Sequence, residues 1–424
     1  MVICQRRPYL LPSSYSRCAA LAVLCAWHTL GIGQAGPALD FQSALLAAQQ
    51  NSPLLQARAA STQGTAALQT SAAVLADPKL SVGITDFPVS GPAQGSLTRD
   101  NFTMRQIGFT QEVPNRAKRA ARGEAALART DKERAMQRID ALTVRRETGL
   151  AWLSRFYAEK RLSLFDTLQS EHSRLTATAT AQYAAGKFNA SAVLTARLDA
   201  LALADRRDEL LRDVEQARAQ LQRWVGPAAR TALAGDVPAQ PSEAAPLHAS
   251  LERSPEVAAF ASAQALAQAE LREANAAKIG DWLWSVNYGR RGQGYGDLVS
   301  VQFTFELPLA PNERQQPLVR AKQYELERLA GERAEVLQQH QQQLDMLLAE
   351  RDEASHKLDR LLQQAQPLAA QRTALTLAAY QSGRDTLSAV LDAGRQQTEL
   401  RLRALELQAK RAAVQWRLNT LTSE

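Results

Sequence analysis

Apolar and polar residues alternate with a period of two in four short stretches of the chain. The clearest stretch begins at Val299, where every second residue up to Leu307 is apolar and the residues between them are polar. Another starts at Trp282, and two more fall at residues 80–84 and 103–113. Because successive side chains of a strand point to opposite faces, the pattern predicts four β-strands in two hairpins, each with one apolar face.

Between and after these strands, apolar residues recur at helical spacing over long distances. Residues 115–182 contain no proline, and a return segment starts at Ser191. A second pair of such segments covers residues 318–380 and 386–421. A helix of about 65 residues extends about 100 Å at 1.5 Å per residue. We therefore expect two long antiparallel helical hairpins, packed as coiled coils or as part of a helical barrel.

The two helical hairpins turn at nearly the same sequence. Residues 183–194 and 380–391 share a Tyr, a Gly and a Ser-Ala-Val-Leu run at a constant offset of 197 residues. The strand ending at residues 109–114 returns in similar form at residues 303–308. Such self-similarity predicts an internally duplicated chain, in which each half contains a helix, two strands, a long helix, a tip and a returning helix.

The first 35 residues have the features of a secretory signal. Basic residues end at Arg17, an apolar run continues to Ile32, and small residues precede a cleavage position after Ala35. A membrane anchor is the weaker alternative, because the run is shorter than the ~20 residues that a span requires. The predicted parts are a signal peptide (1–35), a first repeat (36–226), a proline-rich linker or equatorial segment (227–246) and a second repeat (247–424).

Composition excludes several classes of function. All three cysteines lie in the signal, so the remainder has no thiol chemistry. The formal charge of +7 includes three arginines of the signal, and the remainder is too balanced to indicate a nucleic-acid partner. The histidines and methionines form no pair at metal-ligand spacing, and no phosphate-binding glycine loop or nucleophile elbow is present. We expect no enzyme activity, no cofactor and no bound metal.

The strands allow two interpretations. They could form soluble hairpins with one buried face, or the wall of a transmembrane β-barrel with one face toward lipid. The secretory signal, and helices too long to cover a hairpin compactly, favour the barrel. Four strands cannot close a barrel and open edges cannot face lipid, so the barrel requires an oligomer. The residues expected to face lipid are Trp282, Trp284, Tyr288, Phe303 and Phe305.

Taken together, these features resemble the TolC-type outer-membrane factor family. The resemblance rests on the tip motif, the strand ending Phe-Thr-x-Glu-Val/Leu-Pro and the duplicated layout, and it extends over residues 39–421. More narrowly, residues 77–80, 97–108 and 111–114, the last followed by Lys118 and Arg119, look like the outer-membrane component of cobalt–zinc–cadmium efflux systems.

The resemblance implies a mainly α fold with a β-barrel part. Three chains would form a trimeric α-helical tunnel across the periplasm and, with four strands per chain, a twelve-stranded transmembrane β-barrel in lipid of the bacterial outer membrane. The implied partners are a periplasmic adaptor and an inner-membrane proton-driven pump of the resistance–nodulation–division type. The predicted function is a passive duct for divalent metal cations. A duct for drug efflux is the first alternative, and a periplasmic coiled-coil scaffold is a less favoured one.

Two groups of functional residues follow from this resemblance. The repeated tips are expected to dock the adaptor, through Tyr183, Gly186, Ser191, Leu194, Tyr380, Gly383, Ser388 and Leu391. Family members often carry two acidic residues that ring the periplasmic aperture, and here only Asp392 remains because Ala389 occupies the other position. Asp392 is equally well explained as an acidic residue in the first turn of a helix, where the helix dipole favours it.

Overall fold

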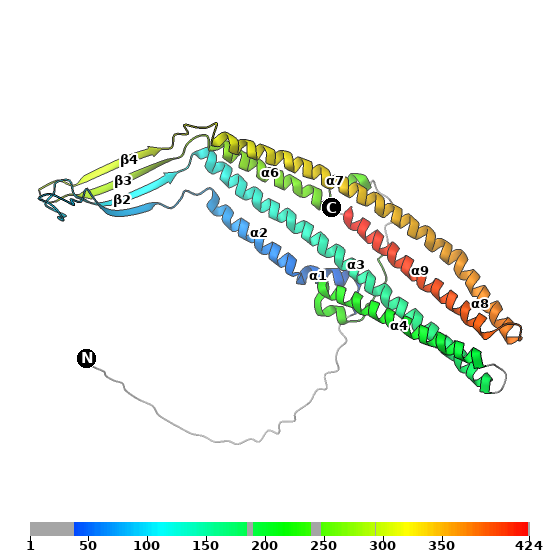
Figure 1. The fold of residues 1–424 in the computed structure, drawn as a ribbon. Coiled ribbons are helices and arrows are strands. Elements are labelled where there is room, and N and C mark those ends of the chain that lie inside the picture. Colours follow the sequence, from blue (N-terminus) through cyan, green and yellow to red (C-terminus); the bar gives the residue numbers. More distant parts are fainter. Residues whose placement is uncertain (1–37, 185–189, 239–246, 293, 423–424) are drawn as a thin grey trace, which may run out of the picture. The chain divides into compact units, whose positions relative to one another are not determined.

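A computed structural model describes residues 38–184, 190–238, 247–292 and 294–422 (Figure 1). The predicted signal and Gly186 lie outside the described residues, as does much of the predicted linker. The first half contains α1 (Phe41–Asn51), α2 (Pro53–Ala72), β1 (Lys79–Thr85), β2 (Met104–Val113), α3 (Arg116–Ala184) and α4 (Ala190–Val225). It is followed by a 3₁₀ turn, η1 (Gly226–Arg230).

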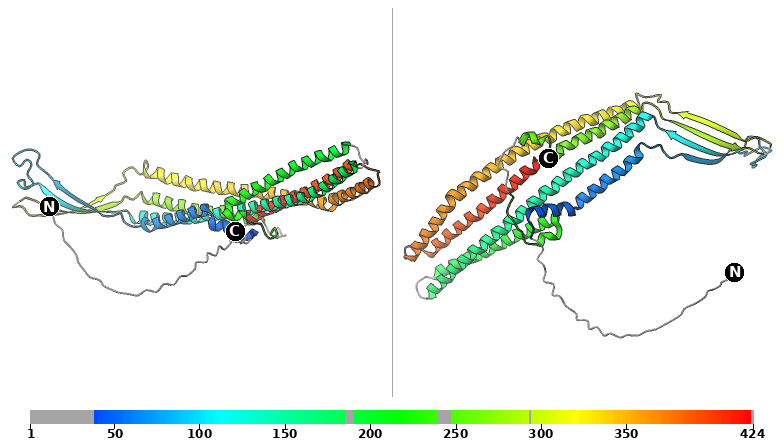
Figure 2. Two further views of the ribbon diagram at one scale, coloured as in Figure 1. Left: turned by 90° about the horizontal axis from the view of Figure 1, so that it is seen from below. Right: turned by 180° about the vertical axis from the view of Figure 1, so that it is seen from behind.

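The second half follows the same order of elements. It contains α5 (Leu247–Leu251), α6 (Pro255–Ala276), β3 (Trp282–Arg290), β4 (Leu298–Phe305), α7 (Gln315–Arg360), a π-helical turn η2 (Leu361–Ala365), α8 (Gln366–Gln381) and α9 (Leu387–Leu421). The helices α3 and α4 run side by side up to their turn, and α8 and α9 do the same (Figures 1 and 2). The expected long helical hairpins are thus confirmed.

The repeated Ser-Pro pairs have a local structural role. Ser52 and Ser254 are N-caps whose hydroxyls accept hydrogen bonds from the amides of Leu55 and Val257, both at 3.4 Å. The proline that follows each serine occupies the first helical position, where an N–H would have no partner inside the helix. The duplicated sequence therefore starts α2 and α6 in the same way.

All four predicted strands are present, and they form one antiparallel sheet in the order β1-β2-β3-β4. The two predicted hairpins are joined because β2 pairs with β3 along its length, from Arg105 opposite Arg290 to Val113 opposite Trp282. Within the described residues, β1 and β4 have no strand on their outer edges.

A polar cluster joins the sheet to the helices at the boundary between the two halves. The side-chain amide of Asn115 donates to the carbonyls of Ala276 (3.0 Å) and Ile279 (2.8 Å). Nearby, Lys118 Nζ lies 2.6 Å from Asp281 Oδ2. These contacts connect the start of α3 with the segment that leads from α6 into β3, and so fix where the sheet meets the helices.

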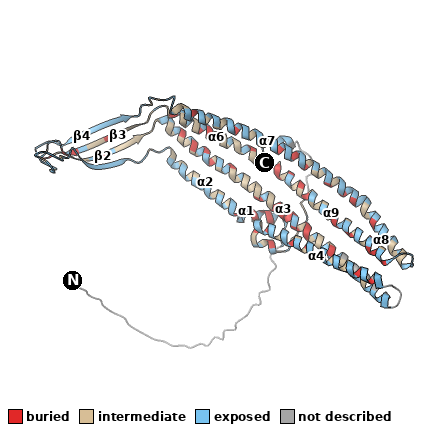
Figure 3. Ribbon diagram, in the orientation of Figure 1, coloured by how far each residue is buried: buried red, intermediate tan, exposed pale blue. Residues whose placement is uncertain are grey.

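The largest apolar core lies where α1, α3, α4 and α9 meet. Trp152 is fully buried, and Phe41 packs edge-on against it at 5.3 Å between ring centroids and against Trp416 at 4.9 Å. The indole N–H of Trp152 donates to the carbonyl of Leu39 at 3.2 Å. Buried residues gather between facing helices, whereas much of the sheet is exposed (Figure 3).

A buried arginine holds the segment after α4 against α3. The guanidinium of Arg155 donates to the carbonyl oxygens of Ala229 (2.6 Å) and Thr231 (2.8 Å). The next residue, Ala232, accepts a backbone hydrogen bond from Leu39 at 2.8 Å. Both ends of the first half are thereby tied to the middle of α3.

The second hairpin differs from the predicted uninterrupted helix over residues 318–380. The α-helical pattern ends at Arg360, and the π-helical turn Leu361–Ala365 precedes Pro367. Proline has no N–H to donate, and its ring collides with the carbonyl four residues earlier, here that of Gln363. A wider turn relieves this collision, which explains why α3 is continuous and its counterpart is not.

Candidate functional site

The first candidate site is the apolar face of the sheet. Trp284 lies opposite Phe303, and Phe109 lies opposite Val286, with 5.6 Å between the ring centroids of Phe109 and Trp284. The other face is polar and small: Ser285 lies opposite Gln302, Asn287 opposite Ser300, and Gly108 opposite Asn287. The alternation of apolar and polar residues in the sequence thus places them on opposite faces of the sheet, as predicted.

This apolar face is largely open. Phe303 is 58% exposed and Phe305 is 64% exposed, whereas Trp282 and Trp284 are half-buried. A soluble hairpin would bury such residues under a helix or a second sheet. Contiguous exposed apolar side chains of this kind mark a surface that meets lipid or another protein. None of the described helices is both long and apolar enough to cross a membrane.

The second candidate site is the turn between α8 and α9. Gly383 has φ of 72°, a left-handed backbone that favours glycine, and its amide donates to the carbonyl of Tyr380 at 3.0 Å. Leu391 is only 5% exposed because it packs with Leu387, Tyr380 and Ala196 of α4. Burial also raises the pKa of the Tyr380 phenol. Ser388, by contrast, lies on the surface.

The turn between α3 and α4 places the repeated residues differently. Leu194 is 58% exposed, although it corresponds to the buried Leu391, and Tyr183 and Ser191 are also exposed. The side chain of Leu391, one of the predicted docking residues, is therefore not available to a partner in this structure. The two tips share a sequence but offer different surfaces.

Asp392, the predicted aperture residue, is exposed and paired. It is the sixth residue of α9, beyond the first turn, so its explanation by the helix dipole is wrong. Its carboxylate accepts a hydrogen bond from Arg395 at 2.7 Å, and Arg395 also lies 3.8 Å from Asp199 of α4. The spacing of three residues between Asp392 and Arg395 indicates a helical ion pair in the sequence, but nothing in the sequence brings Asp199 near. Arg395 thus joins the two hairpins close to their tips.

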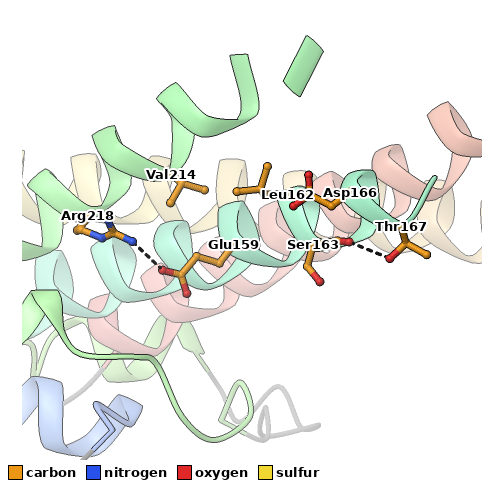
Figure 4. Close-up of a pocket in the computed structure, with 7 residues that line it drawn as sticks. All are labelled: Glu159, Leu162, Ser163, Asp166, Thr167, Val214 and Arg218. Atoms are coloured by element: carbon orange, nitrogen blue, oxygen red, sulfur yellow. Dashed lines mark hydrogen bonds and ion pairs between the residues drawn. The ribbon is translucent and has the colours of Figure 1, made fainter. Parts of the chain in front are cut away.

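A shallow groove of about 580 Å³ lies between α3 and α4 (Figure 4). Its polar side chains take part in local interactions: Arg218 lies 3.8 Å from Glu159, and the Thr167 hydroxyl donates to the Ser163 carbonyl at 3.1 Å. Among the residues that the structure describes, no group of three or more His, Cys, Asp or Glu could hold a metal ion. The groove contains no arrangement that indicates catalysis.

No protein-family model matches the sequence, and no curated protein matches it either. The fold is similar to that of several solved structures. A membrane protein from Pseudomonas aeruginosa has a TM-score of 0.77 at 18% identity, with 90% of each chain covered. CusC, a protein that forms a transmembrane channel, has a TM-score of 0.76 at 16% identity, with 90% of this chain and 91% of that chain covered.

The outer membrane channel CmeC from Campylobacter jejuni also has a TM-score of 0.76, at 11% identity, with 90% of this chain and 85% of that chain covered. Likeness at these identities concerns the fold. The chain therefore has the fold of TolC-type outer-membrane channels.

Proposed function

We propose that the chain is the outer-membrane duct of a tripartite efflux system, which passively exports divalent metal cations. The observation that carries this proposal is the sheet, whose apolar face is exposed and whose two outer edges have no strand among the described residues. The sheet continues into helices of up to 69 residues, too long for a compact domain. The similarity in fold to outer-membrane channels supports the same function.

Closing the sheet requires further copies of the chain. Open strand edges leave unpaired N–H and C=O groups, which are costly in a bilayer because no water is present there to bond them. If β4 of one copy pairs with β1 of the next, three copies complete a twelve-stranded barrel. Such a head-to-tail contact generates a closed ring when the rotation closes.

The helices also offer two surfaces for contact between copies. Leu194, Leu198 and Leu201 form an exposed stripe on α4 at helical spacing. Leu368 and Leu375 are exposed on α8, and α3 and α9 lie between these two outer helices (Figure 1). We place the α4 stripe of one copy against the α8 stripe of the next, in a trimeric helical tunnel across the periplasm.

The partners in this proposal are a periplasmic adaptor, docked at the hairpin tips, and an inner-membrane proton-driven pump. The metal cargo is supported by the resemblance of residues 77–80 and 97–108 to components of cobalt–zinc–cadmium systems. A duct gains nothing from tight ligation, because a strong site would retain its cargo. Growth of a deletion strain in zinc, cobalt or cadmium salts, compared with growth in drugs, distinguishes this cargo from drug efflux.

A disulfide crosslink tests the assembly directly. Leu198 lies eight residues after the start of α4 and Leu375 lies six residues before the end of α8, so Leu198→Cys combined with Leu375→Cys in one chain is expected to crosslink neighbouring copies. Oxidised whole cells should give a covalent trimer in the outer-membrane fraction, and each single variant should not. A monomeric band from the double variant, or recovery in the soluble periplasmic fraction, would contradict the proposed duct.

The charge at position 392 is expected to affect ion selectivity. If Asp392 side chains converge on the pore axis, Asp392→Asn should weaken cation preference and Asp392→Arg should reverse it, because rings of charged side chains set selectivity in other pores. Reversal potentials across planar bilayers measure this preference. Asp385→Asn, a neighbouring acidic change at the same tip, is the control. Unchanged selectivity in both Asp392 variants would place Asp392 away from the pore.

A further inference from the structure

Two arginines lie directly opposite each other at the end of the sheet that is farthest from the helices. Arg105 near the start of β2 is the register partner of Arg290 at the end of β3, and both side chains are exposed. Directly opposite residues have Cβ atoms about 5 Å apart, and like charges in such a pair destabilise a sheet. The stability of the sheet therefore does not explain why two arginines lie at these opposite positions.

Within the described residues, neither guanidinium has a carboxylate at ion-pair distance. Two acids near this end of the sheet have other partners: Asp297 accepts the hydroxyl of Tyr288, and Asp100 accepts the hydroxyl of Thr103 at 3.2 Å. By contrast, Lys79 at the opposite end of the sheet is paired with Glu112 at 2.5 Å. The pair Arg105–Arg290 thus carries two positive charges whose donors are free to bind an anion.

The face of the sheet on which these arginines lie indicates where a bound anion would be located. Arg105 shares its face of β2 with Ile107 and Phe109, and Arg290 shares its face of β3 with Tyr288 and Val286. The arginines therefore lie on the apolar face, at its helix-distal limit. In the proposed duct this face meets lipid and the helices lie in the periplasm, so the pair lies at the outer surface of the membrane.

We propose that Arg105 and Arg290 together bind a phosphate group on an anionic lipid headgroup of the outer leaflet. A guanidinium presents parallel N–H donors that fit phosphate oxygens, and two adjacent guanidinium groups match the double negative charge of a phosphomonoester. Arg291 does not share this role, because its Nε donates to the carbonyl of Gly296 at 3.0 Å. Both arginines come from one chain, so every copy holds a complete site.

This inference rests on the proposed function, and lipid retention by the purified full-length protein tests it. The protein is placed in phosphatidylcholine nanodiscs with diphosphoryl lipid A, with dephosphorylated lipid A, or with added inorganic phosphate. Native mass spectrometry counts the lipid that each copy retains. The double variant Arg105→Gln/Arg290→Gln is expected to retain diphosphoryl lipid A at least about tenfold less well than the unchanged protein, since hydrogen bonds to charged groups contribute that much or more.

Two further variants define the specificity of the effect. Arg105→Lys/Arg290→Lys keeps both charges but removes the planar forks, and an intermediate loss is expected. Arg99→Gln changes an exposed arginine in the loop between β1 and β2 and should leave retention unchanged. Dephosphorylated lipid A should be retained weakly, and equally, by every variant.

The outcomes separate this inference from the duct itself. Equal retention of diphosphoryl lipid A by the unchanged protein and the glutamine double variant, with both recovered as outer-membrane trimers, would overturn the lipid site alone. Displacement of the lipid by inorganic phosphate at equal concentration would overturn it too, by showing a site for free anions. An unchanged protein that does not enter the outer membrane would overturn both proposals.

Discussion

Phe303→Arg is expected to prevent stable insertion of the protein into the outer membrane. Phe303 is the sixth of the eight residues of β4, lies opposite Trp284, and has 58% of its surface exposed on the apolar face. An arginine facing lipid near the bilayer midplane costs about 2–4 kcal/mol, and a trimer would incur this cost three times. The measurement is the amount of heat-stable trimer in the outer-membrane fraction, which should fall to a small part of that of the unchanged protein.

The adjacent residue provides a matched control. Gln302 lies on the polar face, opposite Ser285, so Gln302→Arg introduces the same side chain one position away but toward the interior of the proposed barrel. This variant should accumulate nearly normally. Equal loss of trimer in both variants would show that the effect of an arginine does not depend on which face of the sheet carries it. Normal accumulation of Phe303→Arg would place the apolar face against something other than lipid.

Trp152→Ala is expected to lower the free energy of unfolding by about 3–5 kcal/mol, the range for removing a large buried aromatic side chain. Trp152 has 0% exposed surface, packs edge-on against Phe41 and stacks on Phe156 with 5.0 Å between centroids. The substitution also leaves the carbonyl of Leu39 without its indole donor. Denaturant unfolding of the purified protein, followed by tryptophan fluorescence and circular dichroism, measures the change.

Two variants separate packing from hydrogen bonding at this position. Trp152→Phe keeps most of the packing and removes the donor, so a loss of about 1–3 kcal/mol is expected. Trp416→Ala removes an indole that is only partly buried, although it donates to the carbonyl of Arg146 at 2.9 Å, and should destabilise less than Trp152→Ala. Equal effects of Trp416→Ala and Trp152→Ala would show that the core is not centred on Trp152.

The sequence was sufficient to predict the strands and the long helices because their signals are local. A period of two placed the last strand at residues 299–307, and the structure has it at Leu298–Phe305. The interruption of the second hairpin also had a local signal in Pro367. By contrast, the contacts of Arg155 with the carbonyls of Ala229 and Thr231 join residues more than seventy positions apart, and no pattern in the chain indicates them.

In the candidate site, too, features that depend on contacts between distant residues could not be predicted from the sequence. The apolar face of the sheet could be read from the sequence, but the difference between the tips could not. Leu194 and Leu391 occupy identical places in the repeated motif, yet α4 contacts α9 through Ala196 and buries only Leu391. Repeated residues predict repeated backbone, whereas their surroundings depend on neighbours that the repeat does not contain.

The π-helical turn before Pro367 makes the two halves of the chain mechanically unequal. The hairpin built on α3 has an uninterrupted ladder of backbone hydrogen bonds over 69 residues, whereas its counterpart is divided at Leu361–Ala365. In the proposed trimer, the six helical hairpins would therefore alternate between hairpins with a continuous long helix and hairpins whose long helix is interrupted by a π-helical turn. The symmetry of such a ring is threefold, and a bending force on its free end would displace every second hairpin first.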